Sequence, residues 1–277
     1  MEHLQLSNLS YADLENTIKT YQSLNFKTAS IEDADKLLRL IIKHFVTQTL
    51  VWKCPVIFRA RKHIDEALFK NTEELIYPKN PTTLGRLNNI GESLFYGASH
   101  HDTALLEVRP RLGDEITILE SRLINSMNVP KFMEVGIREL MTKQNHSLEF
   151  IMKNRTFLNK ELVTEDNKKR YTTINNFLVN EITKIVRDDE SHKYKGTIAI
   201  GQFYINGNNL VDGMLYPSIN RNGAECIVIK PESYHSFYRP DRCFKVKIVE
   251  INSLGIPSAL CVDNSTKIDS DGNITWT

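Results

Sequence analysis

Residues 84–107 read LGRLNNIGESLFYGASHHDTALLE, and they place an arginine in a predicted turn where it could bind an anion. Gly85 and Gly91 flank Arg86, and glycines suit a turn that needs positive φ angles and little side-chain cover. A planar guanidinium group can donate two parallel hydrogen bonds to a phosphate or a carboxylate. The spacing alone does not separate this role from that of an ordinary surface arginine.

A glutamate ends this stretch, on a predicted helix whose other members are small or apolar. Glu107 stands next to residues 104–106 on one side and Val108 on the other. Burying a carboxylate among such neighbours is costly unless the charge is paired. Arg111 follows four residues later, so an ion pair on an exposed helix surface explains Glu107 equally well. Both interpretations stay open at this point.

Two further polar side chains could contact a ligand, although each also has a simpler structural explanation. In the predicted strand SLFYGAS, the period of two directs Leu94 and Tyr96 to one face and Phe95 to the other. A tyrosine in a strand is most often a half-buried structural residue. Ser218 follows a proline at the end of the apolar segment DGMLYPS, where a serine hydroxyl commonly caps a turn.

Neither the histidines nor the cysteines indicate a metal site or a thiol nucleophile. His100 and His101 are adjacent at a predicted helix start, where neighbouring side chains cannot face one metal ion. The tail KIDSDGNITWT resembles a calcium loop in part, but Lys267 stands where the first aspartate belongs. We therefore expect no metal. The cysteines, none of them in a CxxC pair and all expected to be free thiols, are Cys54, Cys226, Cys243 and Cys261.

Two helices are predicted within residues 1–50. Ser10 with Asp13, and Ser30 with Asp33, match a pattern in which a hydroxyl and a carboxylate satisfy the free N–H groups of a first helical turn. The helix after Ser30 carries a wide apolar stripe, which favours packing onto a larger core. A dimer contact, a partner surface or a built-in regulatory element is the alternative.

Strand patterns dominate the sequence after residue 50. The polar stretch 62–83 contains two prolines and predicts a long loop. The DG pair at 271–272 predicts a hairpin turn in the tail. Alternating or continuous apolar residues predict strands at 51–60, 93–99, 115–123, 212–218, 225–231 and 243–251.

Helical patterns interrupt the strands in two places. Residues 99–108 predict a helix with Ser99 as its N-cap. Residues 147–162 and 172–186 carry apolar residues at helical spacing within strongly charged surroundings. The region from about residue 125 to residue 194 is therefore predicted to be rich in charge and largely helical.

Composition indicates a globular protein without an electrostatic preference for nucleic acid or membranes. Hydrophobic residues make up 41% of the 277 residues and charged residues 25%, a balance that supports a core. Lys and Arg total 35 against 34 Asp and Glu, so direct nucleic-acid binding is not expected. The N-terminal segment is polar and acidic rather than a secretory signal, and no apolar run is long enough to span a membrane. A cytoplasmic location is therefore expected.

The order of these motifs resembles the RES domain family, which is named for an arginine, a glutamate and a serine. The matching elements are IFRA, the turn GRLNNIG, a strand ending in tyrosine, the helix segment ALLE, and DGMLYPS followed by ECIVIKP. The resemblance covers about residues 51–262, with 125–190 as an insertion, 1–50 as a helical extension and 263–277 as a tail or hairpin. It implies an α+β fold similar to that of ADP-ribosyltransferases, with small mixed or antiparallel sheets and flanking helices.

The resemblance also implies an enzyme that degrades NAD. Many family members are toxins of bacterial toxin–antitoxin pairs that cleave the nicotinamide–ribose bond by hydrolysis or phosphorolysis, and a few transfer ADP-ribose to proteins. The antitoxin typically carries a helix-turn-helix DNA-binding domain and plugs the active site. NAD is then the substrate, no other cofactor is expected, and the expected partner is such an antitoxin, with a homo-oligomer as a further option.

Carried onto this sequence, the resemblance implies a role for each of five residues. Glu107 would stabilise the positive charge that develops on the ribose as the bond breaks. Arg59 and Arg86 would bind the pyrophosphate. Tyr96 would offer its ring or its hydroxyl to the nicotinamide end, and Ser218 would position the substrate or Glu107.

One residue departs from the family pattern, and the identity of one family arginine in this chain is ambiguous. An aromatic residue usually follows the glycine–arginine pair, whereas this chain has Leu87. Either Arg59 or Arg61 could be the first arginine, and the position at the strand end favours Arg59. Leu87 keeps open a catalytically silent module that binds NAD, ADP-ribose or a partner protein. That hypothesis stands beside an NAD-degrading enzyme and a mono-ADP-ribosyltransferase that modifies proteins.

Overall fold

The computed structural model of the protein describes residues 10–42, 49–63, 67–137, 164–207, 209–253 and 255–277. In these ranges the chain has an α+β fold, as predicted, with helices that flank a mixed sheet. None of the described helices is long and apolar enough to cross a membrane. The helical elements are α1 (Tyr11–Gln22), α2 (Ile31–Ile42), α3 (Glu73–Ile76), α4 (His101–Glu107), α7 (Glu165–Ile182), η1 (Asp188–Lys193), α8 (Tyr194–Gly201), η2 (Gln202–Asn206) and α9 (Pro231–Phe237).

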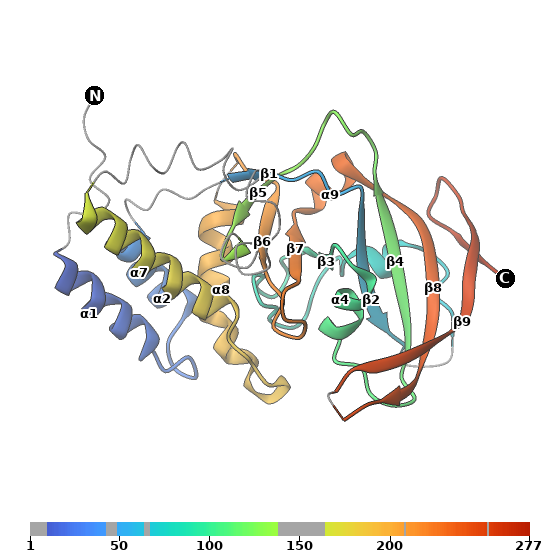
Figure 1. Cartoon of the computed structure of the whole chain (residues 1–277), viewed down its shortest axis with the longest axis horizontal. Helices are drawn as coiled ribbons and strands as arrows, with labels where there is room; N and C mark the ends of the chain where they lie inside the picture. The colour runs from blue at the N-terminus through green and yellow to red at the C-terminus, as the bar shows by residue number, and fades with distance from the viewer. Residues whose placement is uncertain (1–9, 43–48, 64–66, 138–163, 208, 254) are drawn as a thin grey trace.

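The described strands form one sheet, in which neighbours pair antiparallel except for β5 and β6, which run parallel. They are β1 (Thr49–Val51), β2 (Val56–Lys62), β3 (Phe95–Ala98), β4 (Glu115–Leu123), β5 (Lys131–Glu134), β6 (Gly213–Pro217), β7 (Glu225–Ile229), β8 (Tyr238–Ile251), β9 (Pro257–Ile268) and β10 (Ile274–Trp276). Their order across the sheet is β1-β5-β6-β7-β3-β2-β4-β8-β9-β10. Figure 1 shows α1, α2, α7 and α8 gathered at one end of the molecule and the long strands β4, β8 and β9 at the other.

The sheet is least continuous between β2 and β3. These two strands, both fully described, share a single residue pair, Phe58 with Ala98. By contrast, β2 pairs with β4 along its whole length, and β3 does the same with β7. The two halves of the sheet therefore meet at one point and diverge beyond it. The small mixed or antiparallel sheets expected from the resemblance are thus joined here into one mixed sheet with this break.

The two N-terminal helices begin where the capping pattern predicts. The Ser10 hydroxyl accepts a hydrogen bond from the Asp13 N–H at 3.1 Å. Ser30 and Asp33 satisfy each other, because the Asp33 N–H donates to the Ser30 hydroxyl and the Ser30 N–H donates to the Asp33 carboxylate. Local sequence thus determines both helix starts.

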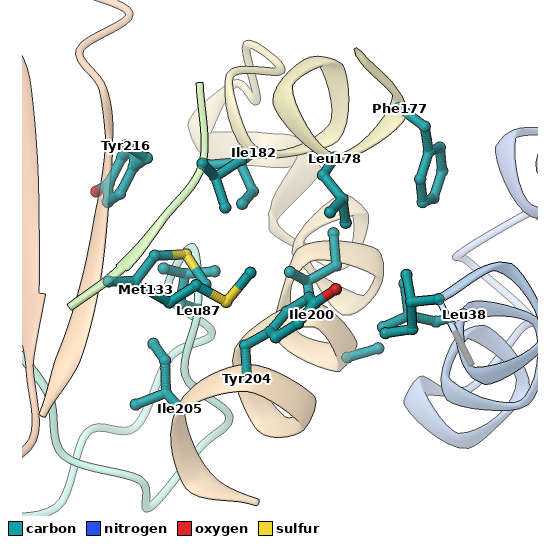
Figure 2. Packing of buried hydrophobic residues seen from close by; sticks show 14 of the residues in the cluster. Leu38, Leu87, Met133, Phe177, Leu178, Ile182, Ile200, Tyr204, Ile205 and Tyr216 are labelled. Carbon is teal, nitrogen blue, oxygen red and sulfur yellow. The ribbon is translucent and has the colours of Figure 1, made fainter. Parts of the chain in front are cut away.

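These helices share a hydrophobic core with α7, α8 and the sheet. Leu38 of α2 is fully buried in the cluster that also contains Ile200 of α8, as Figure 2 shows. Tyr21 of α1 donates its hydroxyl to the carbonyl oxygen of Gly196 at 2.7 Å. A Cβ at Gly196 would lie 2.9 Å from the Phe26 ring, so glycine allows α8 to approach this closely. Residues 10–42 consequently pack as part of the main core.

Two predicted segments differ from the observed elements. The single strand predicted over 51–60 is divided into β1 and β2, since Pro55 lies between them and has no N–H to donate to a ladder. Within the segment expected to be a helical insertion, β5 is a strand that pairs with β1 and β6. Its buried part is only Phe132 and Met133, which is too short to give a strand period in the sequence. The helix predicted over 147–162 lies outside the described residues.

The tail forms the predicted hairpin, but it is not a separate unit. Strands β9 and β10 pair across a turn in which Gly272 has a φ of +81°. The boundary expected between residues 262 and 263 falls inside β9, which pairs with β8 on both sides of it. The Trp276 indole donates to the Phe69 carbonyl at 2.8 Å. This bond holds the tail against the polar segment 67–83, where the short helix α3 replaces part of the predicted loop.

Candidate active site

A cavity of about 470 Å³ opens beside the break between β2 and β3. Glycine is required at this break, because a Cβ at Gly97 would lie 2.7 Å from the Phe58 carbonyl oxygen. Among the described residues, five cationic side chains line the cavity against one carboxylate, so it suits an anionic ligand. The lining residues are Arg59, Ala60, Lys62, Gly85, Arg86, Tyr96, Gly97, Ala104, Glu107, Val108, Arg109, Arg111, Tyr194, Tyr216, Ile219, Asn220 and Cys226.

The lining carboxylate belongs to Glu107, the last residue of α4. The Ser218 hydroxyl donates to its Oε1 at 2.5 Å, across 111 residues of sequence. Arg111 lies beyond the end of the helix, and the described residues contain no ion pair between it and Glu107. The chain leaves the helix here because Arg109 adopts a φ of +49°, the left-handed conformation that often ends helices. The interpretation of Glu107 as a surface ion pair with Arg111 is therefore wrong.

Ser218 caps a turn and also contacts Glu107. Its hydroxyl oxygen accepts hydrogen bonds from the backbone N–H groups of Asn220 at 3.2 Å and Arg221 at 3.0 Å, as a turn cap does. Its hydroxyl hydrogen is directed to Glu107. Because the turn fixes the oxygen, the hydroxyl holds the carboxylate in one orientation.

The start of α4 differs from the prediction. The N-cap position is occupied by His100, which makes no side-chain capping bond. Ser99, the predicted N-cap, instead donates its hydroxyl to Oε1 of Glu225 at 2.6 Å. This hydrogen bond to a charged acceptor directs the Ser99 side chain toward β7. His100 and His101 are both exposed, as expected.

Arg59 reaches across the break in the sheet. It lies on β2, and its Nη1 donates to the Tyr96 carbonyl on β3 at 2.8 Å. Among the described residues, its Nε is a buried donor without a hydrogen-bond partner, while the side chain as a whole contributes to the lining of the cavity. Burial lowers the pKa of Arg59 to about 9, so the guanidinium stays cationic at neutral pH. Arg61 does not line the cavity, and the geometry therefore favours Arg59 as the arginine of this site.

Arg86 joins the cavity to the end of α7. Its Nη1 donates to the carbonyl oxygens of Ile182 at 2.5 Å and Lys184 at 3.0 Å. Its guanidinium lies over the ring of Tyr194, 5.6 Å from the centroid. Arg86 is thus not a simple surface arginine. One of its nitrogens anchors the segment after α7 while the side chain lines the cavity.

The Tyr96 hydroxyl is occupied by the turn that carries Arg86. It accepts from the Leu87 N–H at 2.9 Å and donates to Asn88 Oδ1 at 2.8 Å. Asn88 Oδ1 would lie 2.1 Å from a Cβ at residue 85, so glycine at this position is what lets the turn fold so tightly. The predicted faces of this strand are confirmed, since Tyr96 and Phe95 belong to different clusters. These bonds use the hydroxyl hydrogen of Tyr96, so the hydroxyl could donate to a ligand only by giving up its bond to Asn88.

Leu87 does not line the cavity. Its side chain is fully buried in the cluster with α8, and Figure 2 shows it among Met133, Ile205 and Ile200. The turn places residues 86 and 87 on opposite sides, so that Arg86 faces the cavity and Leu87 faces the helical core. Leu87 therefore gives no structural reason to expect a reshaped nicotinamide pocket.

Several residues that line the cavity were not predicted from the sequence. Tyr216 stands two positions before Ser218, and the period of two in the predicted strand would have placed both on one face. Lys62 follows Arg59 on β2, where its Nζ contacts the Asp114 carboxylate at 2.7 Å and donates to the carbonyl oxygen of residue 109 at 2.8 Å. No local pattern distinguishes such rim cations from ordinary surface charges.

Comparison with known proteins identifies one family. A family model described as RES domain matches residues 56–245, which is more than half of the chain. The match begins at the first residue of β2 and ends within β8, so it includes all five residues considered above for the site. No curated protein and no solved structure matches the chain.

Proposed function

This chain belongs to the RES domain family, and on that premise we propose that it is an enzyme that cleaves the nicotinamide–ribose bond of NAD. At the level of the family, the match indicates an NAD-related, toxin-like function. The proposal of bond cleavage rests on the Glu107 carboxylate, to which the Ser218 hydroxyl donates a hydrogen bond. Within the described ranges, the other charged residues that line the cavity are cations.

Binding of the dinucleotide follows from the charges of the cavity. The pyrophosphate of NAD is anionic, and guanidinium groups bind such oxyanions through paired hydrogen bonds. Arg59 lines the cavity from β2, and Arg86 faces it from the turn before β3. The net charge of the whole chain is only +1, so the cationic character is a local property of this site.

Cleavage breaks the bond between the anomeric carbon of the ribose and the pyridinium nitrogen. The bonding electron pair goes to that nitrogen, so nicotinamide leaves as a neutral molecule and needs no general acid. The ribose is left with oxocarbenium character, which a nearby ionised carboxylate stabilises. Ser218 binds one oxygen of Glu107, and this orients the other oxygen for the ribose hydroxyls or the developing cation.

The cation is then captured by a nucleophile. Attack by water releases ADP-ribose and a proton, whereas attack by inorganic phosphate gives a phosphorylated ADP-ribose. We propose one of these two acceptors for the reaction. Transfer to a protein side chain uses the same cation and is the alternative, as is binding of NAD without turnover.

The test is to incubate the purified protein with NAD and to measure free nicotinamide, with and without phosphate, beside the Glu107→Gln variant. We expect release by the wild-type protein and a loss of about 100-fold or more in the variant, because a lost electrostatic contact of this kind is worth about 3–4 kcal/mol. Faster release with phosphate identifies phosphorolysis. If nicotinamide appears only when other proteins are added, the activity is protein ADP-ribosylation, and release unaffected by Glu107→Gln contradicts the proposed mechanism.

A toxin or defence role extends this proposal. Expression in a bacterium should then lower cellular NAD and arrest growth, and Glu107→Gln should abolish both effects. A neutralising partner, which we expect to carry a helix-turn-helix domain, should restore growth when it is produced together with the wild-type chain. Growth arrest that persists with Glu107→Gln would show that toxicity does not depend on this site.

A further inference from the structure

Tyr216 is a cavity residue to which the motifs of the family resemblance assign no role. It lies on β6, opposite Cys226 of β7 and two residues before Ser218. Its side chain is 5% exposed, and it belongs to the lining of the cavity that contains Glu107. The strand therefore presents a phenol and the Ser218 hydroxyl on the same side of the sheet.

The Tyr216 hydroxyl has no hydrogen-bond partner among the residues that the structure describes. Figure 2 shows it directed away from the other labelled side chains of the helical cluster. Among the residues that the structure describes, no hydrogen bond involves this hydroxyl. Tyr96, another tyrosine of the cavity, differs in this respect, because its hydroxyl hydrogen is already donated to Asn88 and its oxygen accepts from the Leu87 N–H. A phenol without a partner beside a cavity can donate to a ligand.

The surroundings of Tyr216 keep it protonated. Burial raises the pKa of Tyr216 well above its ordinary value, and the nearby Cys226 and Glu107 raise it further while Arg86 opposes them. The residue is consequently a neutral donor at any physiological pH. In a cavity that already provides arginines for phosphate groups, a neutral donor near Glu107 suits an uncharged oxygen of the ligand.

We propose that Tyr216 is a further catalytic residue, which donates a hydrogen bond from its hydroxyl to an uncharged oxygen of the dinucleotide beside the bond that is cleaved. This inference rests on the proposed NAD-cleaving function. Two oxygens have this chemistry, the carboxamide oxygen of nicotinamide and a hydroxyl of the adjoining ribose. The carboxamide oxygen gains electron density as the pyridinium becomes neutral, so a donor placed there binds the transition state more strongly than the substrate.

The test compares Tyr216→Phe with a matched control, Tyr204→Phe. Within the described ranges, Tyr204 also has a buried hydroxyl without a hydrogen-bond partner, but it lies inside the helical cluster and does not line the cavity. We expect Tyr216→Phe to lower kcat/KM for nicotinamide release by about 10- to 100-fold, as when a site loses one well-placed donor, with an unchanged melting temperature. Tyr204→Phe should leave activity unchanged. Equal kcat/KM in wild type and Tyr216→Phe overturns the inference while leaving the proposed function intact.

An analogue distinguishes the two acceptor oxygens. In NAD whose carboxamide oxygen is replaced by sulfur, a weaker acceptor, the effect of Tyr216→Phe should shrink if the carboxamide is the partner and persist if a ribose hydroxyl is. If the wild-type protein releases no nicotinamide, the proposed function fails, and the contact is tested by NAD binding instead. Weaker binding by Tyr216→Phe than by Tyr204→Phe would then support the contact, and equal binding would overturn it.

Discussion

The hydroxyl of Ser218 lies 2.5 Å from Oε1 of Glu107, and it is fixed there because its oxygen also caps the N–H groups of a turn. Glu107 ends a helix and Ser218 follows a strand, so their contact joins the two elements at the cavity. Within the described part of the chain, the Ser218 side chain makes no hydrogen bond to a cationic side chain. In the proposed mechanism, its function is therefore to orient the Glu107 carboxylate.

Ser218→Ala should therefore reduce turnover more than it reduces stability. We expect kcat to fall by about 10- to 100-fold, as when a group that orients a functional side chain is removed. Loss of the turn cap should lower the free energy of unfolding by about 1 kcal/mol. Ser99→Ala is the matched control, since it removes a hydroxyl bonded to Glu225 outside the cavity lining. A Ser218→Ala enzyme with wild-type kcat would show that the contact does not orient Glu107 for catalysis.

Arg86→Lys should weaken NAD binding although it keeps the positive charge. Lysine cannot form the paired hydrogen bonds of a guanidinium, and we expect the Kd measured by calorimetry to rise by about 10-fold or more. Arg39→Lys serves as a control, because Arg39 makes an exposed ion pair with Asp35 on α2. Since Arg86 also anchors Ile182 and Lys184, the melting temperature should be recorded for each variant. Wild-type affinity in Arg86→Lys would leave this arginine with the anchoring role alone.

The buried charge of Arg59 gives a pH dependence of opposite sign for binding and for stability. Burial lowers the pKa of Arg59 to about 9, so this cation is lost from the folded protein as the pH rises through that value. NAD affinity should fall over this range. The unfolded chain keeps its arginine protons to a higher pH, so the same titration should increase the free energy of unfolding of the ligand-free protein.

Titrations of wild type and Arg59→Gln on both sides of this pH test the assignment. The glutamine variant lacks the titrating group, so its weaker affinity should show a smaller decline with pH. An identical pH profile in the two proteins would assign the decline to other groups of the cavity.

Helix α2 should be necessary for folding rather than for control of the site. Leu38 is fully buried in the core shared with α8, and Leu38→Ala should lower the free energy of unfolding by about 2–5 kcal/mol. Leu40, on the same helix, is 49% exposed, and its replacement by alanine should change stability by less than about 0.5 kcal/mol. Urea unfolding measures both. A stable deletion of residues 1–50 with higher turnover would instead support the regulatory interpretation of this segment.

Local chemistry determined those features that the sequence alone could predict. The capping pairs at Ser10 and Ser30 depend on residues three positions apart, and they appear as predicted. The alternating apolar residues of 115–123 match the bounds of β4, because a period of two is a local property of extended backbone. The ordered motifs around Arg86 and Glu107 sufficed to indicate the family, since each is a short contiguous pattern.

Tertiary structure decided which polar groups meet. Ser218 and Glu107 are 111 residues apart, and no spacing rule could join them or exclude Arg111 as the partner of Glu107. Only the folded chain shows that the Tyr96 hydroxyl bonds to the neighbouring turn. Likewise, only the folded chain shows that Tyr216 lines the cavity and that its hydroxyl has no hydrogen-bond partner among the described residues. A polar group bonds to whichever partner the packed chain brings within about 3 Å, and that choice depends on the global arrangement of the strands. The sequence therefore indicated candidate residues for the site, and the packed chain decided which of them line the cavity and which further residues, Tyr216 among them, lie beside them.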